Sequence, residues 1–284
     1  MTEAIHDIQA TLADLRVGDG SAVTVMGALN VSPESFYAGS IIPDVSALIK
    51  QALGMVEAGA KVIDVGAFST APYRDTAISP EEEARRLRRA VTALVTEIPV
   101  PVSADVNRPL PARVALEAGA RILNDVTGLA DPGVAALAAR FDGVILMAFG
   151  DGPWRGEPIE RIRALLGEAI LRARAAGVPV ERIILDPGIG FFRRTGWPWH
   201  EWDCAVLARL HDLLPLGRPL CVATSRKSFI GAIGDQEEPE ARLPGSLASA
   251  AIAVLHGAHL IRTHDVAETR QAVRVAEAIR NHLG

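Results

Sequence analysis

Acidic and amide side chains recur in this 284-residue chain at the ends of short apolar runs. The clearest case is Asp186, which follows the apolar run 183–185 and is followed at once by Pro187 and Gly188. An acid at the carboxyl end of a buried strand, beside backbone that can approach a ligand closely, is typical of a binding site. Asp-Pro-Gly is also a common turn sequence, in which the aspartate caps the next helix. The motif alone leaves both interpretations open.

Polar residues follow most of the other apolar runs in the same way. They are Asn30; Asp64, Ser69 and Thr70; Asp105 and Asn107; Asn124 and Asp125; Thr224, Ser225, Arg226 and Lys227; and Arg262, His264 and Asp265. Acceptors and an amide, which suit a flat heterocycle with several N–H groups, come from Asp105, Asn124 and Asp186. Donors and positive charge, which suit a phosphate or carboxylate, come from Asn30, Lys227, Arg262 and His264. A single site with an acceptor side and a cationic side would suit a nitrogen heterocycle that carries an anionic leaving group.

Two of these features also have simpler interpretations. Asp64 is expected to be a hydrogen-bonded support inside the mouth rather than a direct participant in the chemistry. The segment Ser225–Lys227 reads either as part of the site or as a solvated turn. Because so many polar residues follow apolar runs at one predicted face, we favour the functional interpretation.

Hydrophobic periodicity predicts the elements that position these residues. Strands are expected at Val23–Leu29, Val62–Val65, Val102–Ala104, Ile122–Asn124, Val144–Met147, Ile183–Leu185, Leu220–Ala223 and His259–Arg262. Each is followed by a helical pattern, at Val45–Ala58, Pro80–Thr96, Leu110–Ala118, Val134–Arg140, Ile159–Ala176, Glu201–Leu214, Leu243–His256 and Val266–His282. Alternating strands and helices imply a parallel sheet covered on both faces.

Eight such units predict an α/β fold, a closed (β/α)₈ TIM barrel over residues 21–284. Neither GxGxxG nor GxxxxGK[ST] occurs where an open nucleotide-binding sheet would need it. Residues 1–20 are expected to form a short N-terminal extension that packs as a helix against the bottom of the barrel.

Composition narrows the classes of function. Hydrophobic residues make up 49% of the chain, which is ample for a large core, and the net charge of -5 argues against a general nucleic-acid or anionic-membrane surface. Residues 1–20 are neither a signal peptide nor a membrane span. The chain has only two cysteines, Cys204 and Cys221, and no CxxC, so we expect a cytoplasmic protein without a disulfide framework.

A set of motifs covers nearly the whole predicted barrel. They are Met26–Phe36, Ile63–Gly66 with Ser69-Thr70, Ser103–Asp105, Asn124–Gly128, Asp186–Phe191, Thr224–Gly231, Pro244–Ala248 and Arg262–Val266. Any one of them is weak evidence. In this order, however, the set resembles the dihydropteroate synthases, the pterin-binding barrel enzymes of folate synthesis.

The resemblance implies a transferase that joins 6-hydroxymethyl-dihydropterin pyrophosphate to an arylamine and releases pyrophosphate. By it, the pterin ring is held by Asp105, Asn124, Asp186 and Lys227, with Asp105, Asp186 and Lys227 acting in catalysis. Pyrophosphate is held by Asn30, Arg262 and His264, with Mg²⁺ near Asn30. The arylamine approaches Ser69, Thr70 and Ser228. A homodimer is expected from the resemblance alone.

The chain departs from the family around the predicted arylamine site. Ala71 stands where an arginine usually follows Ser69-Thr70. Arg74, Arg193 or Arg194 could replace it, which would preserve the use of p-aminobenzoate. Alternatively, the Ser-Thr-Ala-Pro-Tyr pattern resembles synthase-like proteins of methanopterin-type cofactors, whose amine is a ribofuranosylaminobenzene phosphate. The tryptophans that follow in the sequence either pack on the outer helices or form a substrate-facing lid.

Two alternatives come from other classes of function. A pterin-dependent methyltransferase shares the barrel and the ring-holding acids, but it has no need of the Ser-Arg-Lys-Ser-Phe and Arg-x-His-Asp elements. A non-catalytic pterin-binding protein is suggested only by the altered amine loops.

Overall fold

Eight parallel strands close into a barrel in the computed structural model, which describes residues 7–31, 44–67 and 78–282. They are β3 (Thr24–Asn30), β4 (Val62–Gly66), β5 (Val102–Asp105), β6 (Ile122–Asp125), β7 (Gly143–Met147), β8 (Ile183–Asp186), β9 (Leu220–Val222) and β10 (Ala258–Thr263). Around the barrel their order is β10-β3-β4-β5-β6-β7-β8-β9. Every bound lies within one residue of its predicted position. The predicted (β/α)₈ TIM barrel is therefore confirmed.

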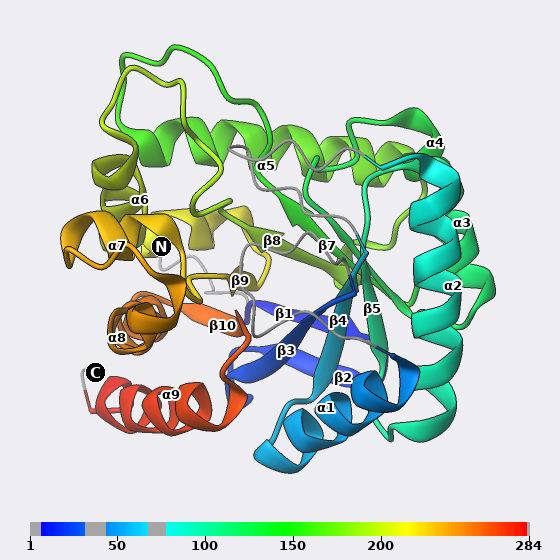
Figure 1. Ribbon diagram of the computed structural model, residues 1–284. Helices are drawn as coiled ribbons and strands as arrows, with labels where there is room; N and C mark the ends of the chain where they lie inside the picture. The colour runs from blue at the N-terminus through cyan, green and yellow to red at the C-terminus, as the bar shows by residue number, and fades with distance from the viewer. Residues whose placement is uncertain (1–6, 32–43, 68–77, 283–284) are drawn as a thin grey trace.

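Helices surround the strands (Figure 1). They are α1 (Val45–Ala58), α2 (Pro80–Glu97), α3 (Pro109–Glu117), α4 (Pro132–Ala138), α5 (Pro158–Ala175), α6 (Trp199–Ala208), α7 (Ser228–Ile233), α8 (Leu243–Leu255) and α9 (Val266–Arg280), with 3₁₀ turns η2 (Val180–Arg182), η3 (Leu210–Leu216) and η4 (Pro239–Arg242). The helix predicted over 201–214 is divided into α6 and η3. Pro215 lies inside η3, where its ring clashes with the preceding turn of a regular α-helix and offers no N–H.

Local chemistry fixes where several helices begin. Asp44 caps α1 by accepting a hydrogen bond from Ala47 N at 2.8 Å, and Ser79 caps α2 by accepting one from Glu82 N at 3.2 Å. Such caps satisfy amide groups that have no partner within the first helical turn. Each cap therefore stabilises the first turn of its helix.

Apolar side chains fill the inside of the barrel. One from each of seven strands joins a single interior cluster, namely Met26, Val62, Ile122, Ile145, Ile184, Cys221 and Leu260. Each of these side chains is at most 1% exposed. The barrel is therefore a packed core rather than a pore, and chemistry is confined to its ends.

A β-hairpin covers the amino-terminal end of the barrel (Figure 1). The strands β1 (Gln9–Leu12) and β2 (Leu15–Gly18) pair antiparallel, so the helix expected in residues 1–20 is wrong for this segment. Burial alternates along β1, a period of two that favours a strand. Leu12 is fully buried and belongs to the interior cluster. The hairpin thus closes the end of the barrel opposite the predicted site.

Replacing Leu12 by alanine should destabilise the barrel by about 2–5 kcal/mol, because it removes a buried side chain and leaves a cavity under the strands. Urea unfolding measures the change. Leu171→Ala is the matched control, since Leu171 is 65% exposed and its loss should cost less than about 0.5 kcal/mol. Equal stabilities of the two variants would contradict the role given to the hairpin.

Candidate active site

The predicted site residues end neighbouring strands at the carboxyl mouth of the barrel. The strand register pairs Asn30 with Gly66, Gly66 with Asp105, and Asp105 with Asn124. Asp186 ends β8 on the other side of the same mouth. Their side chains come from strand ends rather than from mobile loops, so the scaffold fixes their spacing.

Two carboxylates share one guanidinium at the centre of this mouth. Arg262 Nε donates to Asp64 Oδ2 at 2.7 Å, and Arg262 Nη2 donates to Asp105 Oδ2 at 2.9 Å. Asn124 Nδ2 also donates to Asp64 Oδ2, at 3.2 Å. We call Asp64, Asp105 and Arg262 the acid–arginine cluster. Asp64 is fully buried and is the hydrogen-bonded support that the sequence predicts.

The acid–arginine cluster keeps buried acceptors available for a ligand. Burial raises the pKa of Asp105 to about 7; Arg262 opposes this effect and Asp64 adds to it. Among the described residues, Asp64 Oδ1 and Asp105 Oδ1 are buried without a hydrogen-bond partner. A buried polar atom left in this way costs about 1–3 kcal/mol, so a ligand N–H that reaches it is favoured.

The position of Arg262 differs from the one that the sequence suggests. The residue pattern groups it on a cationic side of the mouth, apart from the acids. In the structure its long side chain lies between Asp64 and Asp105, so the predicted separation is wrong for this residue. Burial would lower the pKa of Arg262, but the two acids outweigh it and raise the pKa above its usual value.

The loop after β8 brings Asp186 and a lysine to the same mouth. Asp186 Oδ1 accepts a hydrogen bond from Gly188 N at 2.7 Å, and burial raises the pKa of Asp186. Lys227 Nζ donates to Ile189 O at 2.9 Å and lies 4.6 Å from the ring centroid of Phe191. Burial lowers the pKa of Lys227 to about 8, against the pull of Asp186, so most of the ammonium stays protonated at pH 7.

Another buried acid, on α6, supports the loop after β8, and the sequence does not predict it. Asp203 on α6 is 1% exposed, and its Oδ1 accepts a hydrogen bond from Gly190 N at 2.8 Å. Burial raises the pKa of Asp203 to about 6, while Lys227 and other cations oppose the shift. Gly190 has φ +86, and a Cβ there would lie 3.0 Å from Lys227 Cδ. Asp203 lies on a helix instead of at a strand end, so no sequence pattern marks it.

His264 is a neutral donor rather than a cation. Burial, with Arg262 and Arg226 adding to it, lowers the pKa of His264 to about 3. Ser225 Oγ accepts a hydrogen bond from His264 N at 3.2 Å and lies 3.0 Å from His264 Nδ1. We infer that the Ser225 hydroxyl donates to Nδ1, so Nε2 carries the ring proton. His264 therefore contributes a hydrogen-bond donor to the predicted donor group, without a positive charge.

Arg226 has a structural role, so the solvated-turn interpretation of Ser225–Lys227 is wrong. Its side chain is 6% exposed, and its guanidinium binds Asp265 through Nε at 2.9 Å and Nη2 at 2.6 Å. Nη1 donates to two carbonyls of η4, at 2.9 and 3.0 Å. The pair joins the loop after β9 to the start of α9 and holds Lys227 in place.

The predicted arylamine residues are described only in part. Ser69, Thr70 and Arg74 lie outside the described residues. Ser228 begins α7, and Arg193 Nη2 donates to its Oγ at 2.5 Å.

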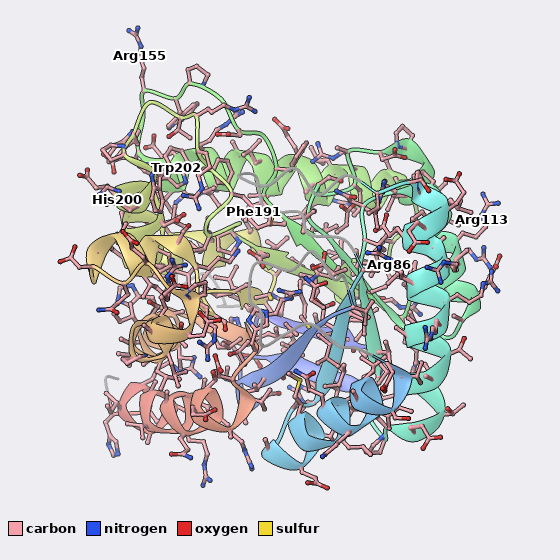
Figure 2. The ribbon with its side chains drawn as sticks, in the orientation of Figure 1. Arg86, Arg113, Arg155, Phe191, His200 and Trp202 are labelled. Atoms are coloured by element: carbon pink, nitrogen blue, oxygen red, sulfur yellow. The ribbon has the colours of Figure 1, made fainter. Side chains whose placement is uncertain are left out.

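The tryptophans near Ser228 favour the packing interpretation, since Trp197 and Trp199 lie against the core cluster and Trp202 is part of it. Trp202 is 1% exposed and stacks on Phe192 with ring centroids 5.2 Å apart, so it belongs to the core. Figure 2 shows Phe191 nearer the strands than Trp202 is. Trp199 instead lies beneath the Arg193 guanidinium, whose carbon is 4.1 Å from the ring centroid.

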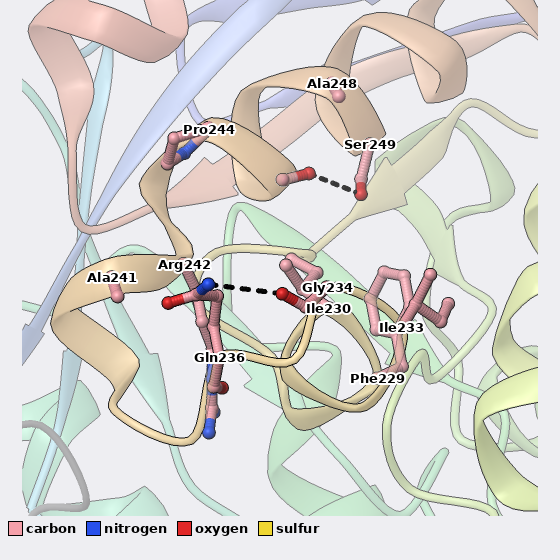
Figure 3. A pocket seen from close by; sticks show the side chains of 11 residues that line it. Phe229, Ile230, Ile233, Gly234, Gln236, Ala241, Arg242, Pro244, Ala248 and Ser249 are labelled. Atoms are coloured by element: carbon pink, nitrogen blue, oxygen red, sulfur yellow. Dashed lines mark hydrogen bonds between the residues drawn. The ribbon is translucent and has the colours of Figure 1, made fainter.

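A separate pocket of 510 Å³ lies between α7 and α8 (Figure 3). Its lining is mostly apolar, with Phe229, Ile230 and Ile233 on one side. Arg242 borders it, but its Nε donates to Gln236 O at 3.0 Å. The pocket lacks the converging acids and cations of the barrel mouth, which stays the candidate active site.

Comparisons with known proteins agree with this geometry. The family model described as "Pterin binding enzyme" matches residues 26–264. The dihydropteroate synthase of Synechocystis sp. is 39% identical over 269 residues, which cover 92% of this chain and 91% of that protein. The Coxiella burnetii synthase, solved in complex with pteroic acid, has a TM-score of 0.85 at 32% identity and covers 96% of this chain and 98% of its own. The Xanthomonas albilineans synthase with 4-aminobenzoic acid has a TM-score of 0.85 at 34% identity, with the same coverage.

The barrel and the matched model define a pterin-binding enzyme. The chain belongs to the dihydropteroate synthase family, and it is a transferase of folate biosynthesis. This membership favours the synthase over the methyltransferase and non-catalytic alternatives.

The acid–arginine cluster predicts an unusual pH dependence of stability. The pKa of Asp105 lies near 7 in the folded protein but near 3.8 when unfolded, so the folded state binds the extra proton between these values. The contribution of Asp105 to folding stability must then fall as pH rises from about 4 to about 7, by up to about 1.4 kcal/mol per pH unit. Asp105→Asn removes this loss and leaves Asp64 paired with Arg262.

Urea unfolding at pH 5, 6, 7 and 8 measures the effect. We expect Asp105→Asn to gain stability over the parent protein as pH rises, with a constant gain above pH 7. Asp235→Asn, at an exposed carboxylate, is the control and should run parallel to the parent. A parallel curve for Asp105→Asn as well would contradict the raised pKa.

Proposed function

We propose that the barrel mouth condenses 6-hydroxymethyl-dihydropterin pyrophosphate with p-aminobenzoate and releases pyrophosphate. The observation that carries the proposal is the pair of buried acceptors, Asp64 Oδ1 and Asp105 Oδ1, without partners among the described residues. A pterin edge is rich in N–H groups and would satisfy such acceptors. Relatives of this chain carry the synthase name, and one was solved with pteroic acid.

In this proposal the pterin ring lies across the mouth from Asp105 to Asp186. Both carboxylates accept from ring N–H groups, Asn124 adds its amide, and Lys227 donates from the ammonium end. As pyrophosphate leaves the methylene carbon, positive charge develops and spreads into the ring. Preformed carboxylates stabilise that charge without reorganising. No protein nucleophile is needed.

We assign the departing pyrophosphate to His264, Arg262 and Asn30, of which Arg262 also binds Asp64 and Asp105. His264 offers a neutral N–H from Nε2, which can hydrogen-bond a phosphate oxygen without a charge of its own. Arg262 and Asn30 complete the set that the family resemblance implies. The arylamine then attacks from a held position, so orientation supplies part of the rate.

Mg²⁺ is the metal that the resemblance implies near Asn30. The donor set fits it, because an amide oxygen is a hard ligand and Mg²⁺ is usually bound by one or two protein oxygens together with substrate phosphates. When bound, the ion would neutralise charge on the pyrophosphate.

The contacts of Arg193 and Arg194 favour p-aminobenzoate as the amine substrate. In the methanopterin-type alternative, the extra phosphate of the amine could meet Arg193 and Arg194. The Arg194 side chain is 82% exposed and its Nε binds Asp151 Oδ2 at 3.2 Å, while Arg193 turns to Ser228. The two guanidiniums have different partners, which favours the smaller amine. A synthase of the same family was solved with 4-aminobenzoic acid.

We also propose a cytoplasmic homodimer, as the sequence and the resemblance suggest. Ile233 on α7 and Ile252 on α8 are 57% and 45% exposed, and a second copy of the chain would cover them. Among the described residues, no helix is long and apolar enough to cross a membrane.

Pyrophosphate release tests the proposed reaction. The pterin pyrophosphate is supplied with p-aminobenzoate or with its ribofuranosyl phosphate counterpart, in parallel. We expect release with p-aminobenzoate and far slower release with the counterpart. Release with neither amine would refute the synthase proposal, and release with the counterpart alone would refute the choice of amine.

Asp186→Asn should lose pterin affinity while the fold survives. Removing a charge-assisted acceptor costs about 1.5–3 kcal/mol, which is a roughly 10- to 150-fold rise in Kd. Calorimetry with the pterin substrate measures it, and Asp142→Asn at the other end of the barrel is the control. Unchanged affinity would remove Asp186 from the site.

A further inference from the structure

One arginine at the edge of the mouth is held in a position to recognise an anion. We propose that Arg193 binds the carboxylate of the arylamine substrate and sets the preference for an acidic amine. The inference rests on the proposed function, since it concerns the second substrate of that reaction. Three observations support it: the hydrogen bonds that hold Arg193, its position beside Ser228, and the charged groups near it.

Asp151 fixes the backbone that carries Arg193. Its Oδ1 accepts from Arg193 N at 3.1 Å and from Arg194 N at 2.9 Å. Its Oδ2 accepts from Arg194 Nε at 3.2 Å. One buried-side carboxylate thus holds both amides and turns Arg194 outward. The guanidinium of Arg193 lies instead against Ser228, the residue that follows Lys227.

Three further contacts fix the Arg193 side chain. Its Nε donates to Gly190 O at 3.1 Å, its Nη2 donates to Ser228 Oγ at 2.5 Å, and its guanidinium stacks over Trp199 at 4.1 Å. A guanidinium held before substrate arrives loses little entropy on binding, and its planar fork matches a carboxylate. Arg193 is therefore preorganised for an anion beside Ser228.

This position is next to the pterin pocket. Ser228 directly follows Lys227, which we place against the pterin ring. Gly190, whose carbonyl Arg193 binds, is followed by Phe191, whose ring lies 4.6 Å from the lysine ammonium. The Phe191 ring offers an aromatic surface beside Lys227 for the aryl ring of the amine. An amine that attacks the pterin methylene would then direct its far end to Arg193.

Local charge also favours an anion at this edge. Lys227 and Arg193 are both cations, and each lowers the pKa of the nearby Asp203. Burial opposes that effect and raises the pKa of Asp203 to about 6. Two cations close together attract a substrate carboxylate more strongly than a neutral amide group.

The test compares p-aminobenzoate with the neutral isostere 4-aminobenzamide. The variants are Arg193→Met, which keeps an apolar side chain over Trp199 without the charge, and Arg193→Lys, which keeps the charge without the fork. Arg194→Met is the matched control. The readout is the ratio of kcat/KM for the two amines, from pyrophosphate release, which cancels any general loss of activity.

We expect Arg193→Met to lower that ratio by about 10- to 150-fold, the loss of one charge-assisted interaction, mainly through a higher KM for p-aminobenzoate. Arg193→Lys should retain part of the preference, and it decides the matter if the Met variant does not fold. Arg194→Met should leave the ratio unchanged. A ratio unchanged in both Arg193 variants overturns the inference alone. Absence of release by the parent protein with either amine overturns the proposed function, and the inference with it.

Discussion

Two buried carboxylates that share one guanidinium define this barrel mouth. Asp64 and Asp105 both bind Arg262, and each keeps one buried oxygen without a partner among the described residues. Burial raises the pKa of Asp105 to about 7, with Asp64 adding to the shift and Arg262 opposing it. Buried oxygens without partners favour the binding of a ligand, because the N–H donors of the ligand can satisfy them. A well-satisfied core would have no such affinity.

The rest of the fold positions this cluster at one end of the barrel. The hairpin β1–β2 packs Leu12 into the interior cluster at the amino-terminal end, and the site residues lie at the carboxyl ends of the strands. Around the mouth, each functional side chain has a buried neighbour that fixes it: Asp203 holds the loop of Gly190, Arg226 holds the loop of Lys227, and Ser225 orients His264. The site is therefore preorganised by residues that need not touch substrate.

The sequence predicts the barrel and most of the mouth because both depend on periodicity and position. Asp105, Asn124 and Asp186 could be found because each ends an apolar run in a βα repeat. Features that depend on contacts between distant parts of the chain could not be predicted in this way. Arg262 reaches back between two acids, His264 loses its charge to burial, and Asp203 comes from a helix. None of these depends on spacing along the chain.

The hairpin was missed for a local reason. Its turn is Ala13-Asp14, with Ala13 at φ 55, instead of the Asn-Gly or Asp-Gly pair that marks a two-residue hairpin loop. Tertiary contacts compensate: Ala13 N donates to Asp142 O at 3.3 Å, and Arg121 binds both Asp14 and Asp142. The barrel thus stabilises a turn that the sequence alone disfavours.

The central claim is that the buried carboxylate oxygens of the acid–arginine cluster accept hydrogen bonds from the N–H groups of a pterin. A carbon-13 NMR titration of the aspartate carboxyl signals, with Asp105 assigned by its asparagine variant, tests it most directly. The account predicts that Asp105 titrates near pH 7 in the free protein, and that its pKa falls when the pterin substrate binds, because ring N–H donors favour the ionised form. Titration near pH 4 in the free protein, or a pKa that the pterin does not move, would contradict it.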